Sequence, residues 1–140
     1  MGETQDFLDA TLLRQLAAEI ALHEGDVEPR LRMWSHDDPV TLFGAYGVAK
    51  QGWAELEETF RWLAGRFSGL EGYDYELVAA GASGDLAYTV GYERHSVSIE
   101  GGPVKPHIIR VTHVYRRENG EWKIVHRHGD EEPVREIPRQ

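Results

Sequence analysis

The hydrophobic pattern of the chain changes after residues 68–69, and this one change limits the folds that the chain can adopt. Before it, apolar residues recur at helical spacing, in residues 4–23 and 53–67. After it, apolar and polar residues alternate in segments separated by turn sequences, as expected of strands with one buried face. Helices followed by a meander of strands predict an α+β domain, with the helices packed on one face of an antiparallel sheet.

Shorter elements complete the predicted order. Gly25 favours a left-handed end to the first helix, and Asp26 then begins a short second helix with Pro29 in its first turn. Residues 40–43 form a strand, residues 44–52 a loop, and a tight turn at 118–120 leads into the last strand, 121–129. The 140 residues fit one domain, 1–140, with a core over 6–130 and an acidic, proline-containing tail over 131–140.

Composition argues against several classes of function. The chain has no cysteine, which excludes disulfides, thiolate chemistry and zinc sites with sulfur ligands. Its 24 acidic and 15 basic residues give a formal net charge of −9, which disfavours nucleic-acid binding. No apolar run approaches the length of a membrane span, and the first residues lack the pattern of a secretory signal. We therefore expect a cytoplasmic protein that binds neither nucleic acid nor membrane.

Three stretches carry a resemblance to a known family: ALHEGDVEPRLRMWSHDDPVTLFG, SGDLAYTVGYERH and IIRVTHVYRRENGEWKIVHRH. Together they resemble the SnoaL-like branch of the nuclear transport factor 2-like superfamily, over roughly residues 6–130. Relatives include ketosteroid isomerases, polyketide cyclases and the association domain of calcium/calmodulin-dependent kinase II. The resemblance implies a cone-shaped, curved antiparallel sheet wrapped around three helices, a fold also called cystatin-like, with one small-molecule pocket. This fold serves enzymes, binding modules and oligomerisation hubs alike.

The ketosteroid isomerase mechanism needs a carboxylate base and two hydrogen-bond donors. The resemblance puts Phe43 where the base belongs, Ala18 where the phenolic donor belongs and His113 where the carboxylic acid donor belongs. Two groups are therefore missing and the third is changed. Steroid isomerisation by that mechanism is not expected.

His113 is the first candidate for acid–base chemistry. It shares the apolar face of its strand with Ile109, Val111 and Tyr115, and apolar surroundings favour the neutral imidazole, which can act as base or donor near neutral pH. The alternative is a core histidine bonded to a backbone or tyrosine partner.

The register of the last hairpin decides which residues join His113. A two-residue turn at 119–120 pairs His113 with His126 and puts His113, His126 and His128 on one face, a set suited to zinc or iron. A turn with a glycine bulge at Gly120 instead puts Val125 and Arg127 opposite His113.

The apolar alternation of Trp122 and Ile124 favours the first register, whereas the resemblance favours the second. We favour the second, in which Trp122 and Ile124 lie on a convex face used for dimerisation, and expect no metal and no cofactor. Arg127 then faces the pocket and can bind a carboxylate or an enolate oxygen. Its alternative role is that of a surface arginine that balances the acidic tail.

Further residues are expected around the pocket. Four residues share one face of the strand before that of His113: Tyr88, Val90, Tyr92 and Arg94. Val111 lies on the same strand as His113, and three aromatic residues are expected at the mouth of the pocket: Trp34, Phe43 and Tyr46. On the outer face we expect a polar part of a dimer interface, formed by Glu93, His95, Arg110 and Thr112.

Three functions fit these expectations. The first is an isomerase, cyclase or dehydratase-like enzyme acting on a hydrophobic carbonyl compound, with His113 as acid and base and Arg127 or Tyr92 stabilising negative charge. The second is a non-catalytic homodimer that binds a small apolar acid, and the third is a hub with a vestigial cavity. A carboxylate inside the pocket would favour the enzyme, but none is found among the positions expected to face inward.

Overall fold

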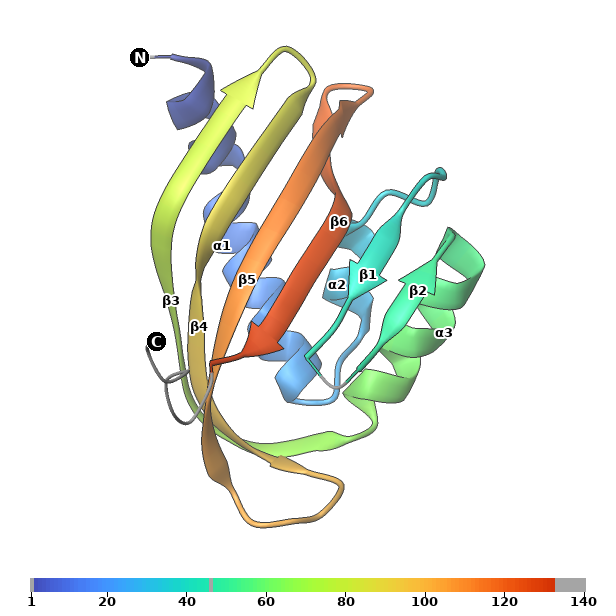
Figure 1. The fold of residues 1–140 in the computed structure, drawn as a ribbon, viewed down its shortest axis with the longest axis vertical. Coiled ribbons are helices and arrows are strands. Elements are labelled where there is room, and N and C mark those ends of the chain that lie inside the picture. The colour runs from blue at the N-terminus through green and yellow to red at the C-terminus, as the bar shows by residue number, and fades with distance from the viewer. Residues whose placement is uncertain (1, 46, 133–140) are drawn as a thin grey trace, which may run out of the picture.

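The computed structural model describes residues 2–45 and 47–132. Its helices are α1 (Glu3–His23), α2 (Glu28–Met33) and α3 (Trp53–Ala64). Its strands are β1 (Thr41–Phe43), β2 (Ala49–Gln51), β3 (Phe67–Ser83), β4 (Leu86–Ile99), β5 (Lys105–Glu118) and β6 (Glu121–Glu131). Figure 1 shows these strands as one sheet in the order β2-β1-β6-β5-β4-β3.

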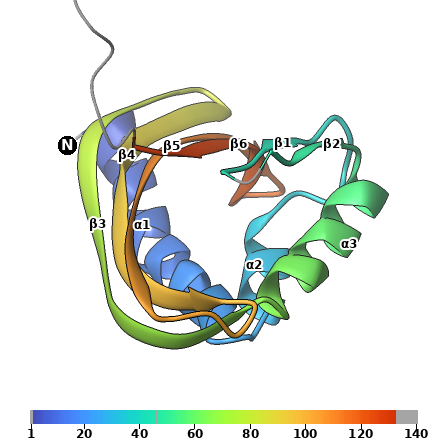
Figure 2. The ribbon, with the colours of Figure 1, turned by 60° about the horizontal axis from the view of Figure 1, so that its bottom comes forward.

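The sheet curls around the helices, so that α1 lies inside the curve of β3, β4 and β5 (Figure 2). This confirms the predicted α+β class with a curved sheet and three helices. Two details of the strand arrangement differ from the prediction. The expected loop 44–52 contains β2, which pairs antiparallel with β1, and β1 pairs parallel with β6. Among the described residues, no helix is both long and apolar enough to cross a membrane.

Helix α1 buries a face that its apolar pattern does not indicate. Its buried residues include Phe7 and Leu22 but also Gln15, Glu19 and His23. The apolar residues that recur at helical spacing are only half-buried: Leu8, Leu12, Leu16 and Ile20. Hydrogen bonds and ion pairs to other buried groups offset the cost of burying most of these polar side chains, as is usual for buried polar groups. The pattern of hydrophobicity therefore places the helix correctly but its buried face wrongly.

The short elements follow the capping signals of the sequence. Gly25 adopts φ +93°, a left-handed conformation that ends α1, and the Asp26 Oδ1 accepts a hydrogen bond from the Glu28 backbone at 3.1 Å beside the start of α2. Helix α3 begins where Asp38 Oδ1 accepts from the Trp53 backbone at 2.9 Å. It ends at Ala64, three residues before the predicted end, because Phe67 already belongs to β3.

The hairpin of β5 and β6 combines features of both predicted registers. Asn119 and Gly120 have φ of 52° and 81°, form a two-residue turn, and pair Glu118 with Glu121. The register then shifts at Val125, which is left without a partner, so that His113 lies opposite Arg127. The favoured pairing of His113 with Arg127 is confirmed, but the bulge lies at Val125 and not at Gly120.

This bulge settles the conflict between apolar alternation and resemblance. Before the bulge, Trp122 and Ile124 point into the core, where Trp122 contacts Phe7 at a centroid distance of 5.1 Å. After the bulge, Arg127 points inward as well. The expectation that Trp122 and Ile124 lie on the convex face was wrong, because one extra residue changes which face the later residues occupy.

Candidate functional site

A cavity opens between the end of α1, the helices α2 and α3, and the concave face of the sheet, at the end of the molecule that Figure 2 brings forward. Its free volume is about 50 Å³, enough for a few water molecules or a small-molecule fragment. Most of the wall is apolar, from Leu22, Leu42, Gly44, Ala45, Val48, Leu63, Phe67 and Ile109. The polar part of the wall consists of His23, Arg30, Glu93, His95 and Arg127.

Glu93 and Arg127 form a buried ion pair beside this cavity. Arg127 donates from Nη1 and Nη2 to the two carboxylate oxygens of Glu93, at 2.9 and 2.8 Å. Burial by itself raises the pKa of the Glu93 carboxyl, but the charge of Arg127 and its hydrogen bonds outweigh burial and lower that pKa. Glu93 is therefore a carboxylate, and its lone pairs already have strong donors.

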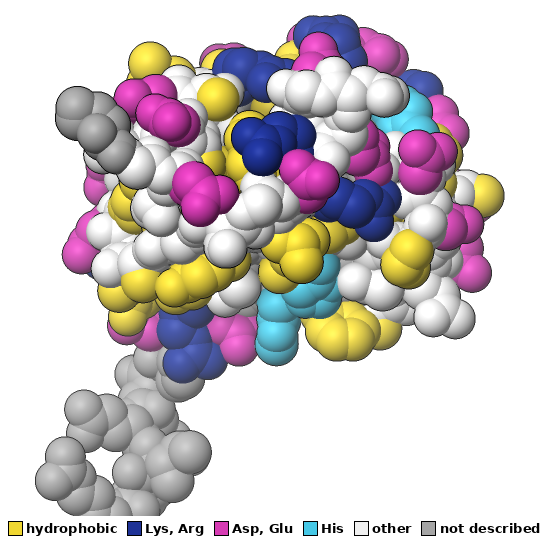
Figure 3. Space-filling view, turned by 90° about the horizontal axis from the view of Figure 1, so that it is seen from above, with side chains coloured by type: hydrophobic (Ala, Val, Ile, Leu, Met, Phe, Trp, Pro, Cys, Tyr) yellow, Lys and Arg dark blue, Asp and Glu magenta, His cyan; other side chains and the backbone are white. Residues whose placement is uncertain are grey.

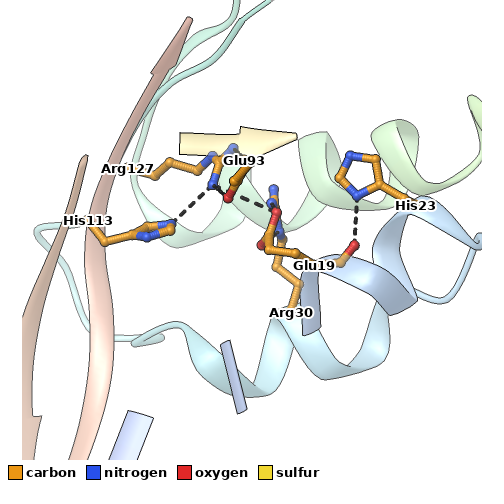
Figure 4. Close-up of polar contacts among 6 residues, drawn as sticks. All are labelled: Glu19, His23, Arg30, Glu93, His113 and Arg127. Carbon is orange, nitrogen blue, oxygen red and sulfur yellow. Dashed lines mark hydrogen bonds and ion pairs between the residues drawn. The ribbon is translucent and has the colours of Figure 1, made fainter. Parts of the chain in front are cut away.

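A second ion pair extends the first into a chain of alternating charge. Arg30 donates to Glu19 from Nε at 3.2 Å and through a close contact from Nη2, and Glu19 Oε1 lies 3.7 Å from Arg127 Nη1. Figure 4 shows the resulting order, Arg30, Glu19, Arg127 and Glu93, with two positive and two negative charges. We call these four residues the charge chain. Its net charge is zero, which reduces the cost of burying four ionised groups.

His113 lies on the inner face, directly behind Arg127. Its Nε2 is 3.2 Å from Arg127 Nη1, and because a guanidinium only donates, Nε2 is the acceptor and the ring is neutral. Burial, and then the nearby charge of Arg127, lower the pKa of His113. His113 does not belong to the cavity wall, so it contacts the site through Arg127.

His23, at the end of α1, is the histidine that the cavity wall presents with a fixed orientation. Its Nδ1 donates to the backbone carbonyl of Glu19 at 2.7 Å, one turn earlier in the helix, which leaves Nε2 with a lone pair. The ring stacks on Phe67 at a centroid distance of 4.5 Å. Burial lowers the pKa of His23 to about 4, so the ring is neutral at pH 7.

His95 lies next to His23, at a centroid distance of 4.4 Å, and completes the polar wall. Its Nδ1 is buried and has no hydrogen-bond partner within the part of the chain that the structure describes. Burial, and then repulsion from His23 when that ring is protonated, lower the pKa of His95 to about 4. A buried ring nitrogen without a partner is uncommon in folded proteins, and because the atom itself is buried, a molecule in the cavity reaches it only if the ring moves.

These groups have the elements of proton-transfer chemistry. A neutral imidazole with a free Nε2 accepts a proton, and guanidinium N–H groups stabilise negative charge that develops on a carbonyl oxygen. Arg30 donates hydrogen bonds to the Glu19 carboxylate from Nε and Nη2, so its Nη1 is not engaged by that carboxylate. Glu93 is a poor base, because the charge of Arg127 stabilises its ionised form.

The model of the SnoaL-like domain family matches residues 11–129. The chain belongs to the SnoaL-like family. Its fold is the nuclear transport factor 2-like fold, related to that of ketosteroid isomerases and dehydratases. No curated protein matches the chain.

Solved structures resemble this SnoaL-like domain at low sequence identity. A candidate dehydratase of the nuclear transport factor 2-like family from Streptomyces avermitilis has a TM-score of 0.74 and 19% identity, over 93% of this chain and 99% of that one. A ketosteroid isomerase-like protein from Erwinia carotovora atroseptica has a TM-score of 0.73 and 18% identity, over 89% and 95%. A candidate calcium/calmodulin-dependent protein kinase type II association domain from Thiobacillus denitrificans has a TM-score of 0.67 and 20% identity, over 86% and 93%. At such identity the likeness shows the fold alone.

The inward face of β4 in this SnoaL-like domain is the opposite of the predicted one. Ala87, Thr89, Glu93 and His95 are buried on the concave side. Tyr88, Val90, Tyr92 and Arg94 point to the outer side instead, so their expected place in the cavity wall was wrong. The cause is that β4 is apolar on its outer face, while its inner face carries polar groups that bind within the charge chain or line the cavity.

The placement of Glu93 and His95 on an outer interface was therefore wrong as well. The sequence pattern does not single out Glu19, His23 and Arg30, which the structure places at the site. The pairing of His113 with Thr89 places Glu93 on the inner face, since every second residue of a regular strand from Thr89 shares its face, but this pairing is known only from the structure. Arg110 and Thr112 do lie on the outer face, where Arg110 pairs with Asp130.

The remaining predicted residues of the SnoaL-like domain lie around the cavity but outside its wall. Trp34 packs on Phe60 in the core, and Val111 is buried on the inner face. Phe43 is half exposed, because its neighbour Leu42 takes the inward position on β1. Val125 is the unpaired residue of the bulge. Tyr46 and residues 133–140 of the predicted tail lie outside the described residues.

The alternative site of three histidines does not assemble. His126 Nδ1 and Thr41 Oγ1 form a hydrogen bond at 2.7 Å, and the rings of His126 and His128 both contact the ring of Phe43. His113, in contrast, lies on the inner face of the sheet. The register at the bulge separates them. Over residues 2–45 and 47–132, no group of three His, Asp or Glu side chains is arranged to hold a metal ion.

Proposed function

We propose that this SnoaL-like domain binds a small carbonyl compound or a small acid in the cavity, and that His23 moves a proton on the bound molecule. The observation that carries this proposal is the orientation of His23. Its Nδ1 is held by the Glu19 carbonyl at 2.7 Å, so the lone pair of Nε2 is available in a cavity whose wall also contains two guanidinium groups. A fixed base next to fixed donors lowers the barrier to removing a proton beside a carbonyl.

In this proposal the other polar residues have distinct roles. Arg30 and Arg127 stabilise the oxygen of the enolate that forms when His23 takes the proton. Glu93 and Glu19 hold the two guanidinium groups in place. His113, the first candidate of the sequence analysis, is proposed as a positioning residue, because it contacts Arg127 at 3.2 Å and does not belong to the cavity wall.

The family supports a reaction of this type without specifying it. Two similar structures are described as a candidate dehydratase and as a ketosteroid isomerase-like protein. The presence of Glu93 also meets the criterion from the sequence analysis that a carboxylate within the pocket favours an enzyme, although the pairing with Arg127 gives it a supporting role.

Deuterium exchange tests this proposal directly. Hydroxyacetone and pyruvate, each small enough for a fragment-sized site, are incubated with the protein in deuterated buffer, and loss of the hydrogens next to the carbonyl is followed by proton NMR. We expect the protein to accelerate exchange in at least one of them, and His23→Ala to lower the acceleration by about a hundredfold or more. The matched control is His36→Ala, an exposed histidine outside the cavity wall. If neither compound binds and neither exchanges, the proposal is wrong.

A second candidate function is a non-catalytic homodimer that binds a ligand in the same cavity. It is favoured by a row of outward residues that crosses the sheet: Val90 pairs with Thr112, Thr112 with His128, and His128 with Phe43. We call these four residues the outer row. In Figure 3, hydrophobic side chains and a histidine gather along the lower edge, on the side of the outer sheet face. Binding of a probe without exchange favours this second candidate.

A further inference from the structure

The charges around the cavity are already balanced before any ligand binds. Within the described residues, the charged side chains of the wall are Arg30, Glu93 and Arg127, and Glu19 stands directly behind them. Each guanidinium has two of its nitrogens engaged by one carboxylate. A ligand with a net negative charge therefore meets no uncompensated positive charge in this site.

A negatively charged ligand that enters the cavity would lose its bound water and would gain no uncompensated positive charge in exchange. Burying a carboxylate is costly unless an opposite charge balances it, and here Glu19 and Glu93 already balance the charges of Arg30 and Arg127. An uncharged ligand avoids this cost, since it needs hydrogen bonds only. The charge chain thus selects against the small acids that the cavity volume would admit.

The wall also offers a hydrogen-bond acceptor, not only donors. His23 Nε2 carries a lone pair because Nδ1 donates to the backbone carbonyl of Glu19. On the donor side, Arg30 Nη1 and Arg127 Nε are the nitrogens that the carboxylates do not engage. A ligand that satisfies both sides needs an acceptor and a donor of its own.

We propose that the ligand is an uncharged carbonyl compound that also carries a hydrogen-bond donor, a hydroxyl or an amide N–H, and that the carboxylates of the same shape are excluded. This inference rests on the proposed function, because it assumes that the cavity is the ligand site. It narrows that function by removing small acids from the possible ligands.

A pair of isosteric probes separates charge from shape. Glycolamide and glycolate have the same size and the same hydroxyl, but only glycolate is charged at pH 7. Binding is followed through the ring signals of His23 and His95 in histidine NMR spectra during titration of each probe. We expect glycolamide to shift both rings saturably, with an affinity at least about tenfold higher than that of glycolate.

One variant should change this preference. Glu93→Gln removes one negative charge and leaves Arg127 with an uncompensated charge, so glycolate should gain at least about tenfold in affinity relative to glycolamide. Asp130→Asn is the matched control, because Asp130 also accepts two hydrogen bonds from one arginine, Arg110, but on the outer face. The control should keep the wild-type preference.

The outcomes are distinct, and the wild-type titration alone is decisive if the variant fails to fold. If glycolate binds the wild-type protein as tightly as glycolamide, the inference is wrong while the cavity remains the ligand site. If neither probe shifts His23 or His95, both the inference and the proposed function fail.

Discussion

Arg127 on β6 holds both oxygens of Glu93 on β4, at 2.9 and 2.8 Å, across the intervening strand β5. The two residues lie 34 positions apart in the sequence. His113 on β5 lies opposite Arg127 and accepts a hydrogen bond from it, so the ion pair connects three strands on the concave face. This relationship fixes the guanidinium of Arg127 at the cavity wall and is the basis of the first prediction.

Breaking the Glu93–Arg127 pair from one side should be strongly destabilising. In Glu93→Gln or Arg127→Met, one ionised group stays buried without its partner, and we expect the free energy of unfolding to fall by about 3–5 kcal/mol in each. Replacing both residues removes both charges, so the double variant should lose much less than the sum. Urea denaturation monitored by circular dichroism measures these differences.

The exposed pair of Arg110 and Asp130 provides the comparison, with similar geometry at the outer face. Water screens that pair, so Asp130→Asn should change the free energy of unfolding by about 1 kcal/mol or less. Equal losses for Glu93→Gln and Asp130→Asn would show that the buried pair has no special role in stability.

Acid should destabilise the protein through the buried histidines. Burial lowers the pKa of His23 from 6.5 to about 4, so the unfolded chain takes up a proton at a higher pH than the folded one does. Folding stability is therefore unaffected by His23 above about pH 7, falls as the pH drops below 6.5, and reaches its full loss near pH 4. A shift of this size corresponds to about 3 kcal/mol for His23, and His95 adds to it in the same direction.

Urea denaturation at pH 7 and pH 4.5 tests this dependence. The wild-type protein should lose stability between the two values, and His23→Gln should lose clearly less because its side chain does not titrate. His36→Gln, at an exposed position outside both the cavity wall and the outer row, should behave as the wild type does. A wild-type protein that is equally stable at both pH values would refute the assignment of His23 as a buried neutral histidine.

The outer row should mediate dimer formation. Phe43 and Val78 are about half exposed on the outer face, and Val78 borders the same groove as Val90 and Thr112. Exposed apolar surface of this kind is typical of interfaces, and we expect a homodimer that buries it with two-fold symmetry. Light scattering should then give twice the chain mass of 15.9 kDa.

Val78→Lys should shift this equilibrium to the monomer. Leu13→Lys is the control, because Leu13 is 80% exposed on α1, on the opposite side of the sheet. A mass near 16 kDa at high micromolar concentration for the wild type would contradict the dimer.

The sequence predicts the order of the elements apart from β2, which lies in the expected loop 44–52, because most elements depend on local signals. Gly25 ends α1, Asp26 lies beside the start of α2, and the turn at Asn119 and Gly120 joins β5 to β6. The resemblance adds the curvature of the sheet and the pairing of His113 with Arg127. These features follow from periodicity, turn chemistry and family, and all are found.

The site could not be predicted in the same way, because its residues are polar and buried. Apolar alternation places Tyr88 inside and Glu93 outside, since a hydrophobicity pattern does not register that Glu93 has Arg127 as a partner on a strand two positions away in the sheet. The bulge at Val125 has no local signal either, and it changes the face of every residue that follows. Only three-dimensional pairing reveals these two facts.

The central claim is that His23 presents a free Nε2 to a ligand in the cavity, and the nitrogen NMR spectrum of its ring tests this most directly. Long-range proton–nitrogen correlations distinguish a protonated ring nitrogen from one that carries a lone pair. At pH 7 we predict a neutral His23 ring protonated at Nδ1, with an Nε2 signal that moves when glycolamide is added. A ring that is charged, or protonated at Nε2, or unchanged by glycolamide would contradict the account.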